Sequence, residues 1–131
     1  MYKTTNNKPF TLKSRFKSFK FAFQGIREVV ATQHNIWIHL ILAILTISLG
    51  FIFNIKATEW IAIVISIGIV FAAEIFNSAL EYVVDMISPD YHEKGGKIKD
   101  LAAAAVFITA LAAAIVGIII FLPELLHIFK K

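Results

Sequence analysis

A hydrophobic segment that continues without a turn residue into a polar motif constrains this chain more than any other feature. Residues 60–73 are almost entirely apolar, and the next twelve residues, EIFNSALEYVVD (74–85), include three acids, one amide and one serine. With about 100° of rotation per residue, positions 74, 77, 78, 81 and 85 fall within roughly 100° of arc on one helical face. The pattern predicts one continuous helix that carries a polar face into an apolar environment.

Composition indicates a membrane protein. Of 131 residues, 58% are hydrophobic, and the mean hydropathy is +0.74. The apolar runs are longer and more uniform than those of a globular helix with one buried face. We therefore expect one all-α integral membrane domain over residues 1–131. Cys is absent, which excludes disulfides, zinc–thiolate clusters and a thiol nucleophile.

The chain divides into segments of different amphipathicity. Apolar residues recur at steps of three and four over residues 12–31, with Lys and Arg on the other side, which predicts an amphipathic helix in the headgroup layer of an anionic leaflet. Packing of this helix only against the other helices is the alternative. Thr58 is expected to cap the second membrane span. The polar connection over residues 89–99 contains a Gly95-Gly96 pair that is expected to be flexible. The predicted segments are a mobile tail (1–10), the surface helix (12–31), three transmembrane helices (36–54, 59–88 and 100–122) and a tail that begins at Pro123 (123–131).

Lys and Arg are distributed unequally between the two sides of the predicted membrane domain. Ten of the 13 lie in the N-terminal segment or in the connection before the third span, and three lie at positions 56, 130 and 131. The positive-inside rule therefore predicts a cytoplasmic N-terminus. No nucleic-acid-reading motif accompanies the basic N-terminal segment, so we expect no nucleic acid partner.

Glu74 and Glu81 are the main candidates for chemistry. An acid inside a membrane is costly and indicates a functional site, although solvation of Glu74 and Asp85 in the headgroup zone is an alternative. The two glutamates lie about 10 Å apart along one face, too far to share a proton. The deeper Glu74 is the more desolvated, which makes it the better proton acceptor and suits a general base acting on a lipid hydroxyl. Glu81 is placed to hold Mg²⁺ on the phosphates of a nucleotide.

The motif E-x-x-N-S-A-L-E-x-x-V-D, together with Lys99-Asp100 and the alanine-rich sequence after it, resembles the signature of the prokaryotic diacylglycerol kinase and undecaprenol kinase family. The similarity extends without gaps from about residue 16 to residue 122. It implies a small lipid kinase of the bacterial inner membrane that uses ATP and Mg²⁺. Such an enzyme phosphorylates a membrane lipid alcohol, diacylglycerol or undecaprenol, in phospholipid metabolism or lipid-carrier recycling. Three helices offer little surface to enclose ATP, metal and lipid, so we expect an oligomer, and the resemblance implies a homotrimer with shared sites.

The resemblance also implies roles for individual residues. Glu74 matches the catalytic base and Glu81 a ligand of the metal and nucleotide. Asn77 and Ala103 are the further residues expected to contact the lipid substrate. The additional nucleotide contacts implied are Asp90, Tyr91, His92, Lys99 and Asp100.

Two positions depart from the family pattern. Gln33 stands where many relatives carry an acid that ligates the metal, so the ligand becomes a neutral amide oxygen and one negative charge is lost. Glu28 is a poor substitute for that acid, because five residues turn a helix by about 140°, unless the backbone breaks within residues 32–35. Phe21 stands where some relatives carry a Tyr near the adenine, so ring stacking is retained and a hydroxyl contact is lost.

Two other functions are consistent with parts of the pattern. A small transporter or proton-coupled channel would use an intramembrane Glu to bind a cation or proton, and it would need neither Lys99-Asp100 nor ATP. A catalytically weakened relative would bind lipid or nucleotide without turnover. Restoration of activity by Gln33→Glu would support the weakened relative, and robust turnover of the unmodified chain would exclude it.

Overall fold

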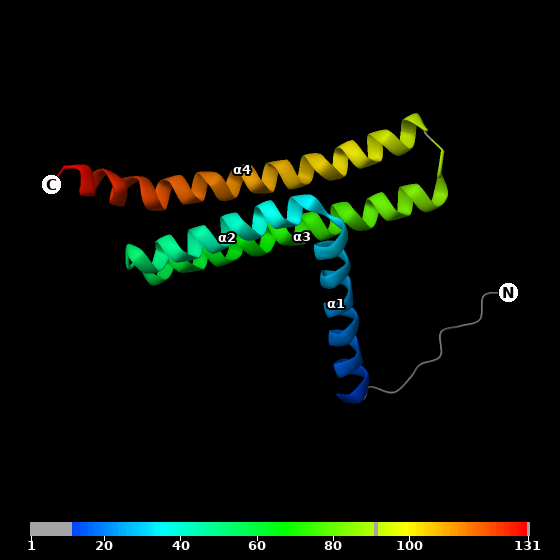
Figure 1. The fold of residues 1–131 in the computed structure, drawn as a ribbon, viewed down its shortest axis with the longest axis horizontal. Coiled ribbons are helices and arrows are strands. Elements are labelled where there is room, and N and C mark those ends of the chain that lie inside the picture. The colour runs from blue at the N-terminus through cyan, green and yellow to red at the C-terminus, as the bar shows by residue number, and fades with distance from the viewer. Residues whose placement is uncertain (1–11, 91, 131) are drawn as a thin grey trace.

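The structure is a computed structural model that describes residues 12–90 and 92–130. All regular secondary structure in these residues is α-helical. The helices are α1 (Leu12–Thr32), α2 (His34–Ile52), α3 (Ala57–Ile87) and α4 (Glu93–Phe129). Helices α2, α3 and α4 run alongside one another, whereas α1 projects from the bundle at a steep angle (Figure 1). The tail expected over residues 1–10 lies outside the described residues.

A single residue separates α1 from α2. Gln33 has an extended backbone (φ −103°, ψ 117°), while its N–H still donates to the carbonyl of Val29 at 2.9 Å. This residue therefore ends one helix and directs the next into the bundle. Its side chain is left at the inner corner between α1 and the other helices.

The α2–α3 turn is tight and has one residue, Asn54, with a positive φ of 50°. The N–H of Lys56 donates to Oε2 of Glu59 at 2.7 Å, so the carboxylate of the first turn caps α3. The expected N-cap at Thr58 is wrong, because Lys56 holds that position. Gly50 allows the indole of Trp60 to lie against α2, since a Cβ there would lie 2.7 Å from the ring.

Helix α3 ends before Pro89, and α4 begins only a few residues later. His92 caps α4 by accepting a hydrogen bond on Nδ1 from the N–H of Lys94 at 3.2 Å. The prediction that Gly95 and Gly96 lie in a flexible connection is wrong, because both residues lie inside the first turns of α4. A Cβ on Gly95 would lie 3.1 Å from Cγ1 of Val84, so the missing side chain brings α4 close to α3.

Helix α4 continues through Pro123 and ends at Phe129, so the prediction of a separate tail that begins at Pro123 is wrong. Proline fixes a φ that a helix accepts, but inside a helix it removes one hydrogen bond and its ring crowds the carbonyl of residue i−4, so α4 continues past Pro123 at an energetic cost. The C-terminal end of α4 extends beyond the α2–α3 turn (Figure 1).

The bundle has a small core and an apolar exterior. Ile63, Ile120 and Phe121 form the buried cluster that holds α3 to α4 near the α2–α3 turn. Large apolar side chains on the outer faces are exposed, among them Ile41, Leu45 and Ile61, which fits a lipid environment. Three helices are long and apolar enough to cross a membrane: His34–Ile52, Ala57–Ile87 and Glu93–Ile128. The prediction of an all-α fold with three membrane-length helices is confirmed.

Candidate functional site

A buried polar patch lies in the second half of α3. Glu74 is 1% exposed, Asn77 7% and Ser78 1%. Ser78 donates its hydroxyl hydrogen to the carbonyl of Glu74 at 2.9 Å, so it is satisfied within the helix. Both carboxylate oxygens of Glu74 and Oδ1 of Asn77 are buried without a hydrogen-bond partner among the described residues. Burial of polar atoms without partners is costly, so the oxygens of Glu74 and Asn77 call for a functional explanation.

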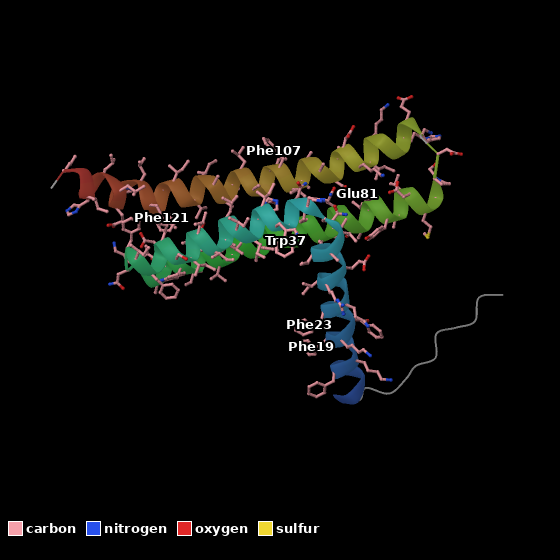
Figure 2. All side chains as sticks on the ribbon, in the orientation of Figure 1. Phe19, Phe23, Trp37, Glu81, Phe107 and Phe121 are labelled. Atoms are coloured by element: carbon pink, nitrogen blue, oxygen red, sulfur yellow. The ribbon has the colours of Figure 1, made fainter. Side chains whose placement is uncertain are left out.

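Glu81 lies two helical turns further along α3 and receives two amide donors. Asn77 donates from Nδ2 to Oε1 of Glu81 at 3.0 Å. Gln33 donates from Nε2 to Oε2 at 3.3 Å. Figure 2 shows Glu81 on α3 near the corner where α1 meets the bundle. The two amides stabilise the negative charge of this carboxylate from α3 itself and from the α1–α2 junction.

The oxygen-bearing groups around Glu81 fit a magnesium ion in their chemistry. In the part of the chain that the structure describes, no three His, Cys, Asp or Glu side chains gather as a metal site. The available donor set is therefore one carboxylate and two amides. Asn77 Oδ1 has no hydrogen-bond partner within residues 12–90 and 92–130, and rotation of the Gln33 amide would present its oxygen in place of its nitrogen. Carboxylate and amide oxygens are ligands that Mg²⁺ accepts, with water and phosphate completing the shell.

A second hydrogen-bond network connects α1 to α3 through Tyr82, the residue next to Glu81. The hydroxyl of Tyr82 donates to Oε1 of Glu28 at 3.1 Å and lies 3.2 Å from Oγ1 of Thr32. Glu28 thus engages Tyr82 on α3. Tyr82 is a residue that the sequence does not reveal as functional, because a lone Tyr in a polar motif carries no signal for a role.

The predicted nucleotide residues lie around the α3–α4 connection. Lys99 donates from Nζ to Oδ1 of Asp85 at 2.5 Å, which joins the start of α4 to the end of α3. Asp90, His92 and Asp100 are exposed at the same end of the bundle. Tyr91 lies outside the described residues.

Two predicted residues are not brought into these networks. Phe21 is 66% exposed on α1, and Ala103 is exposed on α4. Both side chains face away from the interior of this single chain.

A cavity of about 440 Å³ lies between α2, α3 and α4, on the opposite side of Glu74 from Glu81 along α3. Its walls are mostly apolar, with small residues such as Ala113 and Gly117 on α4. His39, Thr46 and Ser66 provide its polar groups. The structure places His39, a polar residue near the start of α2, on the wall of this cavity. The signal that finds it is helical spacing, because His39 shares a face of α2 with the buried Ile36 and Ala43.

Comparison with known proteins decides the family. The family model described as prokaryotic diacylglycerol kinase matches residues 20–121. The chain belongs to the prokaryotic diacylglycerol kinase family. The resemblance seen in the motif at residues 74–85 is thereby confirmed, and the matched segment includes both polar networks on α3.

Kinases that act on different lipid alcohols, by their names, are similar to this chain. It is 38% identical over 110 residues to the undecaprenol kinase of Bacillus subtilis (strain 168), a match that covers 84% of this chain and 89% of that protein. It is 36% identical over 119 residues to the diacylglycerol kinase of Haemophilus influenzae, covering 91% and 94%. It is also 36% identical over 112 residues to the diacylglycerol kinase of Synechocystis, covering 85% of this chain and 64% of that protein.

Proposed function

We propose that this chain is a lipid kinase that transfers the γ-phosphate of ATP to the hydroxyl of a membrane lipid alcohol, with Mg²⁺ as the metal. The observation that carries the proposal is the carboxylate of Glu74. It is 1% exposed, has no hydrogen-bond partner in the part of the chain that the structure describes, and lies in a helix of membrane-spanning length. The hydroxyl of a lipid in the bilayer is a suitable hydrogen-bond donor to this buried carboxylate.

In the proposed reaction Glu74 is the general base. One of its carboxylate oxygens takes the proton of the lipid hydroxyl while the hydroxyl oxygen forms a bond to the γ-phosphorus. The bond between that phosphorus and the bridging oxygen of ADP breaks, and ADP leaves with the electron pair. A carboxylate without competing hydrogen bonds in a site of low polarity is a strong proton acceptor.

Glu81, Gln33 and Asn77 are the residues that would hold the metal. When bound, Mg²⁺ neutralises charge on the phosphates of the nucleotide. The support for this set is the convergence of Gln33 and Asn77 on the two oxygens of Glu81. Without a metal, the same amides would keep the carboxylate oriented.

Lys99 is the proposed cation for the phosphates. Its contact with Asp85 supports this role, since it holds the ammonium group at the end of the bundle that carries Glu81 rather than leaving it free in solvent. Asp90, Tyr91, His92 and Asp100 are proposed to complete the nucleotide site. Phe21 is proposed to approach the adenine ring, and Ala103 and Asn77 the lipid.

The proposed setting is the cytoplasmic membrane of a bacterium, with the N-terminus in the cytoplasm. The exposed Phe16, Phe19 and Phe23 on α1 support a surface helix that lies in the headgroup layer. We propose a homotrimer, because one chain leaves the cavity beside α4 and several predicted site residues, such as Phe21 and Ala103, open on its surface. A second subunit would cover such faces and share the sites.

The experiment that tests this function measures transfer of radiolabelled γ-phosphate, with Mg²⁺, to diacylglycerol and to undecaprenol presented in parallel. The expected result is a labelled lipid phosphate from one or both alcohols, which also names the substrate. Intact ATP binding without any product would contradict the kinase and favour a weakened relative, which Gln33 in place of an acid makes a specific alternative. Restored transfer in Gln33→Glu would then identify that alternative.

A further inference from the structure

Tyr82 connects two helices directly beside the proposed metal ligand Glu81. Its hydroxyl lies 3.1 Å from Oε1 of Glu28 and 3.2 Å from Oγ1 of Thr32. The hydroxyl hydrogen of Thr32 is used within α1, where it is donated to the carbonyl of Glu28 at 2.9 Å. The Tyr82 proton is therefore directed at acceptors on the last turn of α1. The carboxylate of Glu28 is the stronger of the two, because it is charged.

The position of α1 depends on this last turn. The helix projects away from the bundle (Figure 1), and Val29 is the one buried residue among those of α1 whose exposure the structure describes. Lys17, Lys20 and Phe23 are exposed. With so little of the helix packed, contacts near Val29 set its angle and its distance from α3.

Gln33 follows immediately after the tethered turn. Its Nε2 reaches Oε2 of Glu81 across 3.3 Å, which is at the long end of the range for such bonds. A small displacement of the end of α1 would carry Gln33 out of reach. The contact between Gln33 and Glu81 is therefore sensitive to whatever fixes α1 against α3.

We propose that Tyr82 and Glu28 are a positioning pair that holds Gln33 against Glu81. The inference rests on the proposed function, in which Gln33 and Glu81 bind the metal of a metal–nucleotide complex. Neither Tyr82 nor Glu28 touches metal or substrate in this arrangement. Their effect is exerted through Gln33.

The first test measures binding of Mn²⁺ by electron paramagnetic resonance, in the presence of a non-hydrolysable ATP analogue, to the full chain in lipid nanodiscs. Tyr82→Phe removes one oxygen and keeps the ring. We expect it to raise the apparent Mn²⁺ dissociation constant three- to tenfold, which is the effect of about one hydrogen bond. In a Gln33→Ala background the same change should have almost no further effect. An equal loss in both backgrounds, or no loss in either, would overturn the inference.

Matched variants separate positioning from a general loss of stability. Glu28→Ala should weaken Mn²⁺ binding as much as Tyr82→Phe, whereas Glu28→Gln should preserve most of the binding, because the amide oxygen still accepts the hydrogen bond. Ser48→Ala is the control for loss of a hydroxyl, since Ser48 donates only within α2, to the carbonyl of Ile44 at 2.8 Å. A loss in Glu28→Gln as large as that in Glu28→Ala would contradict the positioning pair.

A second readout does not depend on metal or nucleotide. Hydrogen–deuterium exchange of residues 28–33 should accelerate in Tyr82→Phe, while exchange in the middle of α4 stays unchanged. Unchanged exchange at residues 28–33 would overturn the tether. Accelerated exchange together with no metal–nucleotide binding in any variant, the unmodified chain included, would support the tether and contradict the proposed function, so the two failures are distinguishable.

Discussion

Glu74 lies in an environment that is unfavourable for a carboxylate. It is buried on α3, where no described residue donates a hydrogen bond to either oxygen, and the neighbouring Ser78 donates to its backbone rather than to its side chain. Two turns away, Glu81 receives both Asn77 and Gln33. The two acids on this helical face therefore differ in the hydrogen-bond donors around them. This difference suits them to different chemical roles.

At the residue scale, Glu74→Gln should abolish most turnover and leave nucleotide binding intact. The amide is of nearly the same size and fills the same buried position, but it does not accept a proton from the lipid hydroxyl. We expect kcat to fall by about 10²- to 10⁴-fold, the usual contribution of a general base. The measurement is phosphate transfer alongside ATP binding. Glu124→Gln, on an exposed residue near the C-terminal end of α4, is the control, and normal turnover in Glu74→Gln would exclude the assigned role.

Gln33→Glu should change the metal dependence. A second carboxylate beside Glu81 adds negative charge to the proposed metal site, so the Mg²⁺ concentration for half-maximal transfer should fall, by roughly three- to tenfold for about 1 kcal/mol of added attraction between ions in a partly exposed site. In EDTA the two like charges repel, and the variant should melt at a lower temperature than the unmodified chain. Gln24→Glu, exposed on α1, is the matched control. An unchanged Mg²⁺ dependence would place the metal away from residue 33.

Two glycines, Gly50 and Gly95, allow neighbouring helices of the bundle to approach each other closely. Gly50 admits the indole of Trp60, which also packs against Phe51 with the ring centroids 4.9 Å apart and the planes tilted by 52°. Gly95 brings the first turn of α4 against Val84. The helices are therefore fixed at both ends of the bundle by close approach rather than by an extensive core.

At the element scale, Gly50→Ala should destabilise the bundle. The added Cβ would lie 2.7 Å from one atom of Trp60 and 2.9 Å from another, so the ring must shift. Overpacking of this kind costs about 1–3 kcal/mol. Thermal unfolding in detergent measures the effect. Gly68→Ala is the matched control, since a Cβ there meets nothing within 4 Å and the alanine favours the helix by up to about 1 kcal/mol. Equal melting temperatures for the two variants would contradict the close-approach argument.

At the scale of the whole molecule, the arrangement of charges determines how the chain sits in a membrane. The α3–α4 connection and the N-terminal helix carry most of the cations, whereas the α2–α3 turn carries Lys56 alone. Together with three membrane-length helices, this distribution predicts that the N-terminus and the α3–α4 connection share the cytoplasmic side.

The absence of Cys from the chain makes this orientation measurable. The single substitutions Thr58→Cys and Glu93→Cys do not change any Lys or Arg. The first places a thiol at the start of α3, and the second places one at the start of α4, at the opposite end of the bundle. A membrane-impermeant maleimide added to intact spheroplasts should label position 58 and spare position 93, and inverted vesicles should show the reverse. Labelling of position 93 in spheroplasts would contradict the predicted orientation.

The oligomeric state is the second prediction at this scale. A trimer in detergent should have a protein mass of about three times 14.7 kDa, because the exposed alanines 103–105 on α4 allow the close helix contacts by which membrane helices associate. Light scattering coupled to size-exclusion chromatography, with the detergent contribution subtracted, gives this mass. A monomeric mass under conditions where phosphate transfer is active would contradict shared sites.

The sequence by itself determined the elements and the membrane class, because helical periodicity and apolar length are local properties. It also placed Glu74, Asn77 and Glu81 on one face of one helix, since residues on a single helix have a fixed geometry. Local pattern alone misjudged the ends of the helices: Lys56 rather than Thr58 caps α3, and Gly95 lies within α4. These ends depend on which side chain or neighbouring helix satisfies the first turn.

Contacts between helices were decided only by the tertiary structure. Gln33 meets Glu81 across a separation of 48 residues, and Tyr82 meets Glu28 across 54. No spacing rule relates such positions, because the angle between α1 and the bundle is set by the extended backbone at residue 33 and by the packing around it. For the same reason His39 has no apparent partner in the sequence, whereas in the structure it lines a cavity with residues of α3 and α4. Chemistry confined to one helix could be predicted from the chain, and chemistry shared between helices required the fold.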